Sequence, residues 1–361
     1  MFSDNMKSFI IINIYFLISI NIILLFAIYY QTIKDEVKNK WYEKVISNLK
    51  PKVLDYIENE YKGAKLKEIL KKDFCKNKAI DIMLDYSEKN DLDINKKFTD
   101  LDLDSFIIKK IQKKVSIVYV RKLAFMKVET AYNRLLETSS SQDLDISYMS
   151  FIGLSMMNIS LQKKIIVIRK LLFSNIHSDR IIEILNKFEL SFGQWLELLE
   201  EEESAEGKVV FIKNINQKQE IKIEENCDRL LKFLKDEKEI KIATILAISN
   251  SKNEKYIDEL ISIYENNKNW EVRVAVAKGL SNFNFQNVHE TLLKMTRDKE
   301  WWIRFNAVKS IISMGEEGIF ALIDLSLESE DKNISELAYS FLSSNKDVYN
   351  IVNKIIKNNE V

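Results

Sequence analysis

The sequence predicts an all-α protein, in which an N-terminal transmembrane helix is followed by an α-solenoid of stacked helical hairpins. The chain has one proline and seven glycines in 361 residues, which leaves little material for tight turns. Its 46% hydrophobic and 30% charged residues suit stacked amphipathic helices. A long uncharged run lies near the N-terminus, and a repeated pattern lies near the C-terminus.

The first element is the uncharged run of residues 8–33, which is 26 residues long. An α-helix rises about 1.5 Å per residue, so roughly 20 residues already span a bilayer core. We therefore expect residues 1–33 to form an uncleaved anchor that contacts membrane lipid through residues 8–33. A cleaved signal peptide is the alternative, but its apolar region would be about 7 to 15 residues long and would end in small residues. This run is longer and ends near Tyr29 and Tyr30.

Lysines lie mainly on the C-terminal side of this run. Lys7 precedes it, and four lysines follow within a few residues: Lys34, Lys38, Lys40 and Lys44. Short flanking segments rich in lysine and arginine stay on the cytoplasmic side of a membrane. The expected localisation is therefore a single-pass membrane protein with the bulk of the chain in the cytoplasm.

The middle of the chain is helical in character and has no clear repeat. We expect residues 34–105 to form a helical stalk or first helical layer, with Pro51 in a first helical turn. Residues 106–206 are expected to form an irregular helical array. Within that array, Ser191 and Gln194 have the spacing of a capping box.

A boundary is expected after the acidic run Glu200–Glu203, which is followed by the sequence SAEGK. We interpret residues 207–223 as a linker, in which Lys208–Ile215 is the one place where a short strand is conceivable. Residues 224–361 are then expected to form a separate array of repeats.

That array shows an internal period of 31 residues, which marks stacked units. The stretches NWEVRVAVAKGL, from Asn269, and EWWIRFNAVKSI, from Glu300, share a skeleton. The aligned pairs are Trp270 with Trp301, Val272 with Ile303, Arg273 with Arg304, Lys278 with Lys309 and Leu280 with Ile311. Two looser copies extend the pattern to four units over residues 224–345. Each unit opens with another amphipathic segment such as YIDELISIY, so the unit is expected to be a helical hairpin.

This pattern resembles the HEAT-repeat family, including its shorter bacterial relatives. The best match is DKEWWIRFNAV, with Asp298 in the turn and Ile303-Arg304 where the family has its "VR" pair. The resemblance implies that Arg273, Arg304 and Asp298 form a structural ladder between adjacent hairpins. It also places Trp270 and Trp301 just ahead of the second helices, where we expect their rings to be buried between hairpins.

Trp302 breaks the period, because the residue after Trp270 is Glu271. On a helix its side chain points about 100° away from that of Trp301, so one of the two is expected to be more exposed. An exposed tryptophan on a solenoid can anchor a partner protein, and Trp302 is our candidate partner-binding residue. The alternative is a packing contact specific to the end of the array.

Composition argues against several function classes. The formal charge is zero, with 54 basic and 54 acidic residues, so no nucleic-acid partner is expected. Cys75 and Cys227 are far apart and lack metal-ligand spacing, and the calcium-like stretch DLDLDS has Ser105 where the loop needs glycine. With only His177 and His289 in the chain, histidine chemistry has little to use. We expect no catalytic residues, no cofactor and no metal.

The predicted function is a membrane-anchored scaffold or adaptor for a protein partner, since stacked hairpins offer a long surface without a chemical centre. Proteins of this layout look like bacterial accessory proteins, and one type is similar to companions of membrane glycosyltransferases that make surface polysaccharide. Frequent Ile, Lys and Asn indicate an AT-rich genome, consistent with a bacterium. The alternative is an enzyme resembling the HEAT-like DNA glycosylases or the bilin lyases. We expect the protein not to be an enzyme.

Overall fold

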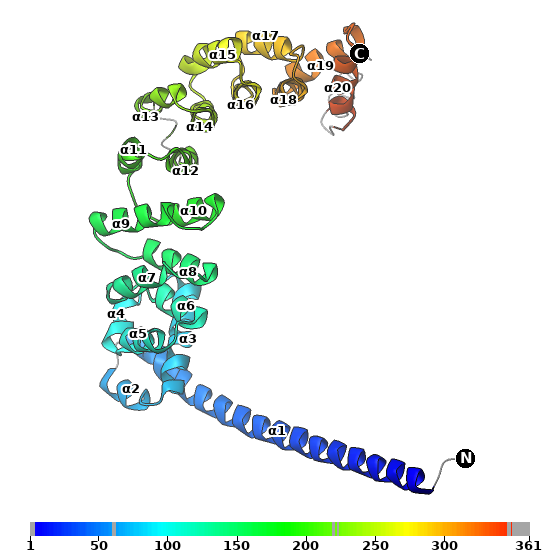
Figure 1. Cartoon of the computed structure of the whole chain (residues 1–361). Helices are drawn as coiled ribbons and strands as arrows, with labels where there is room; N and C mark the ends of the chain where they lie inside the picture. Colours follow the sequence, from blue (N-terminus) through cyan, green and yellow to red (C-terminus); the bar gives the residue numbers. More distant parts are fainter. Residues whose placement is uncertain (1–3, 60–62, 219–220, 222–223, 345–347, 349–361) are drawn as a thin grey trace, which may run out of the picture. The chain divides into compact units, whose positions relative to one another are not determined.

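The computed structural model describes residues 4–59, 63–218, 221, 224–344 and 348 (Figure 1). The side chains of residues 4–16, 18, 224, 225 and 328 are outside that description. All regular elements in the described ranges are helices, so the predicted all-α class is confirmed. The chain divides into two compact units, Met1–Arg169 and Lys170–Val361.

The first unit contains a long N-terminal helix and a set of shorter ones. Its elements are α1 (Asp4–Asn59), α2 (Gly63–Ile69), α3 (Asp73–Asn90), α4 (Asn95–Asp100), α5 (Leu103–Lys113), α6 (Ile117–Met126), the 3-10 helix η1 (Glu129–Ala131), α7 (Tyr132–Thr138) and α8 (Leu144–Ser155). The next helix, α9 (Leu161–Leu172), crosses the boundary between the units. Fully buried side chains such as Val53, Met83, Ile107, Leu123 and Phe151 form the core of this unit.

The expected membrane anchor falls on the N-terminal part of α1. Residues 8–16 and 18 of the anchor lie outside the described side chains. From Leu17 to Ile33 the large apolar side chains that are described are exposed. Among the described residues, none of the helices combines the length and the apolar character that crossing a membrane requires.

Pro51 lies inside α1, whereas the sequence analysis placed it in a first helical turn. An internal proline removes one backbone hydrogen bond and costs about 3 kcal/mol. The helix continues through it because Leu49 and Val53, on either side, are buried, and α1 packs against α3. Tertiary packing therefore outweighs the local preference of proline for a helix start.

Helical hairpins make up the second unit. Its elements are α10 (Ser178–Leu185), α11 (Phe192–Glu201), α12 (Ala205–Asn216), α13 (Glu224–Asp228), η3 (Leu231–Lys235), α14 (Lys238–Asn250), η4 (Glu254–Tyr256), α15 (Ile257–Asn266), α16 (Trp270–Leu280), α17 (Gln286–Met295), α18 (Trp301–Ile312), α19 (Glu316–Glu328) and α20 (Lys332–Ser344). Helix α11 begins with the predicted capping box: Ser191 Oγ accepts from the Gln194 amide, and the Gln194 side chain accepts from the Ser191 amide.

The hairpins stack in two layers. In each pair α15–α16, α17–α18 and α19–α20 the two helices pack together, and α12, α14, α16, α18 and α20 contact one another in succession. We call this succession the second-helix layer; α15 and α17 lie together on the other side of it (Figure 1). The architecture of this unit is the predicted α-solenoid.

Residues 207–216 of the expected linker form most of α12, so this segment is neither a linker nor a short strand. Ser204 caps this helix by accepting from the Gly207 amide, and Val210, Phe211 and Ile215 are buried along it. The acidic run therefore ends one helix and the serine starts the next. Burial of an apolar stripe makes the segment part of the stack, since α12 packs on α11 and α14.

Candidate functional site

Two equivalent turns organise the hairpins of the repeated segment. Asn267 Oδ1 accepts a hydrogen bond from the Asn269 amide at 2.9 Å, and Asp298 Oδ1 accepts one from the Glu300 amide at 3.0 Å. Short side chains of this type stabilise a turn by bonding to the backbone two residues on. Asparagine therefore replaces aspartate in the earlier repeat without loss of the turn.

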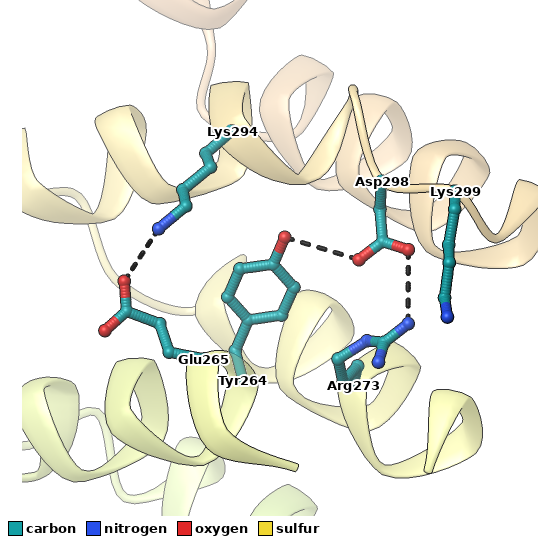
Figure 2. Close-up of a pocket in the computed structure, with 6 residues that line it drawn as sticks. All are labelled: Tyr264, Glu265, Arg273, Lys294, Asp298 and Lys299. Carbon is teal, nitrogen blue, oxygen red and sulfur yellow. Dashed lines mark hydrogen bonds and ion pairs between the residues drawn. The ribbon is translucent and has the colours of Figure 1, made fainter. Parts of the chain in front are cut away.

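Arg273 of α16 joins its own turn to the next one. Its Nη1 donates to the Asn267 carbonyl at 3.3 Å, and its Nη2 lies 3.2 Å from Asp298 Oδ1 (Figure 2). The two side chains are only 11% and 10% exposed, so the ion pair is largely shielded from water. Arg273 Nε is buried and has no hydrogen-bond partner among the described residues.

The ion pair lines an open polar pocket of about 320 Å³. The pocket is lined by Tyr264, Glu265, Arg273, Lys294, Asp298 and Lys299. Tyr264 Oη donates to Asp298 Oδ2 at 3.4 Å, and Lys294 Nζ pairs with Glu265 at 2.8 Å (Figure 2). Burial, together with the nearby Asp298 carboxylate, raises the pKa of Tyr264 to about 12. From the sequence, Tyr264 was expected only as part of the amphipathic segment YIDELISIY, with no role in a site.

Arg304, which is equivalent to Arg273, has different partners. Its Nη1 donates to the Asp298 carbonyl at 2.9 Å and to the Lys299 carbonyl at 3.1 Å, within its own repeat. Ser329 stands 31 residues after Asp298, so the next repeat lacks an aspartate at the matching place. Among the described side chains, Arg273 therefore has a carboxylate partner in the next turn, whereas Arg304 has none.

The three tryptophans of the repeats are exposed. Trp270 is 40% exposed, Trp301 46% and Trp302 54%, whereas we expected the rings of Trp270 and Trp301 to be buried between hairpins. Both are the first residue of their helix, and the buried positions are taken two residues later by Val272 and Ile303. Helical geometry turns the tryptophans away from that buried face.

These side chains line a groove of about 360 Å³ between α16 and α18. Its lining residues are Trp270, Val274, Lys278, Trp302, Phe305, Asn306 and Lys309, and we call it the α16–α18 groove. Trp270, Val274 and Lys278 are four residues apart and share one face of α16. The groove thus brings together the partner candidate Trp302 and Trp270 from the neighbouring repeat.

An aromatic cluster borders this groove on α18. Trp301 and Trp302 meet edge to face with ring centroids 4.7 Å apart, and Phe305 stacks on Trp301 at 5.0 Å. Phe305 also contacts Phe341 of α20 at 5.1 Å. Such pairs hold the rings in place, so Trp302 is preorganised although it is exposed.

Residues 257–343 match the family of HEAT repeats. This segment is therefore similar to HEAT-repeat arrays. The match covers α15 to α20, which contain both turns, the Arg273–Asp298 pair and the α16–α18 groove. None of the curated proteins that were compared with the chain matches it.

In the described part of the chain there is no group of three or more His, Cys, Asp or Glu residues placed to hold a metal ion. Cys75 and Cys227 are both buried. His177 caps α10 by accepting from the Asp179 amide, and His289 lies on α17 with Nε2 3.8 Å from Glu317 of α19.

Phe305, Val274 and Asn306 were not expected from the sequence as members of the α16–α18 groove. Lys278 and Lys309 were aligned, but no role was expected for that pair. The signal that could have found these residues is spacing. In α16 the groove residues follow Trp270 at four and eight positions, and in α18 they follow Trp302 at three, four and seven, which is one face of a helix.

Proposed function

We propose that the protein is a HEAT-repeat scaffold that binds a protein partner on the second-helix layer of its C-terminal repeats. The observation that carries the proposal is the exposed tryptophan cluster formed by Trp270, Trp301 and Trp302. Tryptophans dominate the binding energy of protein interfaces when they lie together in a preorganised patch. A monomeric surface normally avoids gathering such side chains.

Trp302 is the residue to change, since it is the most exposed of the three and departs from the repeat. Trp302→Glu restores the residue type found after Trp270. We expect it to leave the thermal melt nearly unchanged and to reduce recovery of a specific partner from cell extract about tenfold or more. Phe173→Glu is the matched control, because Phe173 is an 83% exposed aromatic residue in the same unit and lies outside the groove.

The result that would overturn the proposal is a large fall in melting temperature for Trp302→Glu with partner recovery unchanged. Trp302 would then belong to the packing of the array. Equal losses of recovery in Trp302→Glu and Phe173→Glu would also contradict it, because a general effect of the added charge would explain both.

We also propose that residues 8–33 anchor the scaffold in a membrane and hold the repeats on the cytoplasmic side. The support is the uncharged run, the exposed apolar side chains from Leu17 to Ile33 and the lysines that follow. A membrane enzyme is then the expected class of partner, and the glycosyltransferases named through the sequence resemblance are one such group. Identification of the recovered protein tests this choice.

A further inference from the structure

We infer that the α16–α18 groove binds an extended peptide segment that carries one large apolar side chain and, three or four residues away, a carboxylate. This inference rests on the proposed scaffold function and adds the chemistry of the partner. The two ends of the groove differ in character, and the distance between them sets the spacing within the ligand.

One end of the groove is aromatic. Trp270 and Trp302 come from the first turns of α16 and α18, and Val274 and Phe305 continue the apolar lining. The rings contributed by α18 are fixed by their contacts with Trp301 and Phe341. A large apolar side chain entering here would bury aromatic surface that is otherwise exposed to water.

The other end is basic. Lys278 and Lys309 lie in the last turns of α16 and α18, and both are exposed. They are the only charged residues that line the groove, and neither has an ion-pair partner among the described residues. Two unpaired lysines on neighbouring helices repel each other, and a carboxylate between them would remove that repulsion.

The spacing between the two ends sets the pattern of the ligand. Trp270 precedes Lys278 by eight residues and Trp302 precedes Lys309 by seven, which is roughly 10 to 12 Å along a helix. An extended chain covers about 3.3 Å per residue, so three or four of its residues bridge this distance. A helical ligand would need about seven residues and would be wider than a single chain.

Asn306, in the middle of the groove, favours an extended backbone as the ligand. Its Nδ2 donates to the Trp302 carbonyl at 2.7 Å, which orients the amide group. Its Oδ1 is then the atom able to accept a hydrogen bond from a peptide N–H. Extended segments present unpaired N–H groups, whereas those of a helix are already bonded.

The test measures binding of synthetic peptides to the immobilised full-length chain. The first peptide has one leucine followed, after a spacer of about three residues, by two glutamates. Its relatives carry glutamine or lysine in place of the glutamates, or place the glutamates directly beside the leucine. We expect the first peptide to bind about tenfold or more tightly than each of these.

Reversing the charge of the two groove lysines should reverse the preference for the glutamate peptide over the lysine peptide. The Lys278→Glu/Lys309→Glu variant is expected to bind the lysine peptide more tightly than the glutamate peptide. The matched control is Lys187→Glu/Lys235→Glu, which makes the same charge change at two exposed lysines outside the groove and should keep the original preference. Trp302→Ser should weaken the binding of all the peptides.

Equal binding of the glutamate and lysine peptides would overturn the inference, as would a preference that survives the reversal at Lys278 and Lys309. A further experiment measures the binding of phosphatidylglycerol vesicles to the native chain and to the Lys278→Glu/Lys309→Glu variant. If the reversal weakens vesicle binding while no peptide binds, the groove recognises a lipid surface and the inference is wrong. Recovery of a partner that depends on Trp302 but not on the two lysines would keep the scaffold and reject the acidic segment.

Discussion

Arg273 and Arg304 occupy equivalent positions in neighbouring repeats, yet the structure gives them different partners. Arg273 forms a shielded ion pair with Asp298, whereas Arg304 bonds only to backbone carbonyls among its described contacts. Removing one partner of a buried ion pair costs about 3 to 5 kcal/mol, because the other charge is left uncompensated. Loss of a hydrogen bond from a charged group costs about 1.5 to 3 kcal/mol.

We therefore expect Arg273→Ala to lower the free energy of unfolding by about 3 kcal/mol and Arg304→Ala by about 1.5 kcal/mol. Urea denaturation followed by tryptophan fluorescence measures both, since Trp270 and Trp301 begin the helices that carry these arginines. In a double-mutant cycle, Arg273→Ala should be strongly coupled to Asp298→Ala, while Arg304→Ala should not. Equal losses for the two arginines would show that the ion pair adds nothing beyond the turn.

Tyr264 allows a test of the same cluster by pH. Burial and the Asp298 carboxylate raise its pKa to about 12, from an ordinary value of about 10. Since the folded state holds this proton more tightly, Tyr264 contributes stability that is fully present below pH about 10 and is lost as the pH rises through about 12. The difference in melting temperature between the native chain and Tyr264→Phe should shrink or change sign across that window. A constant difference would mean that Tyr264 titrates normally.

At the scale of the element, the second-helix layer is held by close contacts and by polar bonds between successive helices. Asn250 at the end of α14 donates to Asn216 of α12 at 2.7 Å, and Asn282 after α16 donates to Asn250 at 3.2 Å. Farther along, Ser310 of α18 donates to the Ala277 carbonyl of α16 at 2.8 Å. These bonds fix the register of each helix against the previous one.

Gly279 of α16 lies close against Ser249 of α14. A Cβ atom there would lie 2.9 Å from Ser249 Cβ and still closer to its hydroxyl group. Gly279→Ala is therefore expected to lower the free energy of unfolding by about 1 to 3 kcal/mol, although alanine is normally the better helix former. Urea denaturation checks this.

Gly193→Ala in α11 is the matched control, because its added Cβ would meet nothing closer than 4.0 Å. It should stabilise the protein by about 0.5 to 1 kcal/mol, in line with the helix preference of alanine. If both substitutions stabilise the protein, the α14–α16 contact is not as tight as the structure has it.

At the scale of the whole molecule, the proposed membrane anchor is the feature to test. Ile20→Arg/Ile22→Arg places two charges within the uncharged run, each costing about 2.5 to 3.5 kcal/mol near the centre of a membrane helix. We expect the native chain to remain in the membrane fraction after an alkaline carbonate wash and the double variant to be released. Ile20→Leu/Ile22→Leu should behave as the native chain.

Protease added to intact cells should spare the chain beyond Lys44 if the lysines orient it as expected. Digestion of that part from outside would reverse the topology. A mature N-terminus near residue 30 would reject the anchor in favour of a cleaved signal peptide.

The class of the fold and its repeats could be predicted from the sequence, because both depend on local patterns. Scarce glycine and proline and the 31-residue offset are visible without any tertiary contact, and the capping box at Ser191 was located to the residue. The segment 207–216 was not recognised as a helix, because the adjoining acidic run suggested a linker and the burial that stabilises α12 comes from α11 and α14.

The sequence by itself determined that the chain is helical, that hairpins repeat, and that Arg273, Asp298 and Trp302 are distinctive positions. Only the tertiary structure decided that Arg273 has a carboxylate partner and Arg304 does not, and that Trp270 and Trp301 face outward. The physical reason is that an aligned position fixes a place within one hairpin. The ion-pair partner comes from the adjacent hairpin, which differs from repeat to repeat, as at Ser329, and the exposure of a side chain depends on which face of its helix is packed.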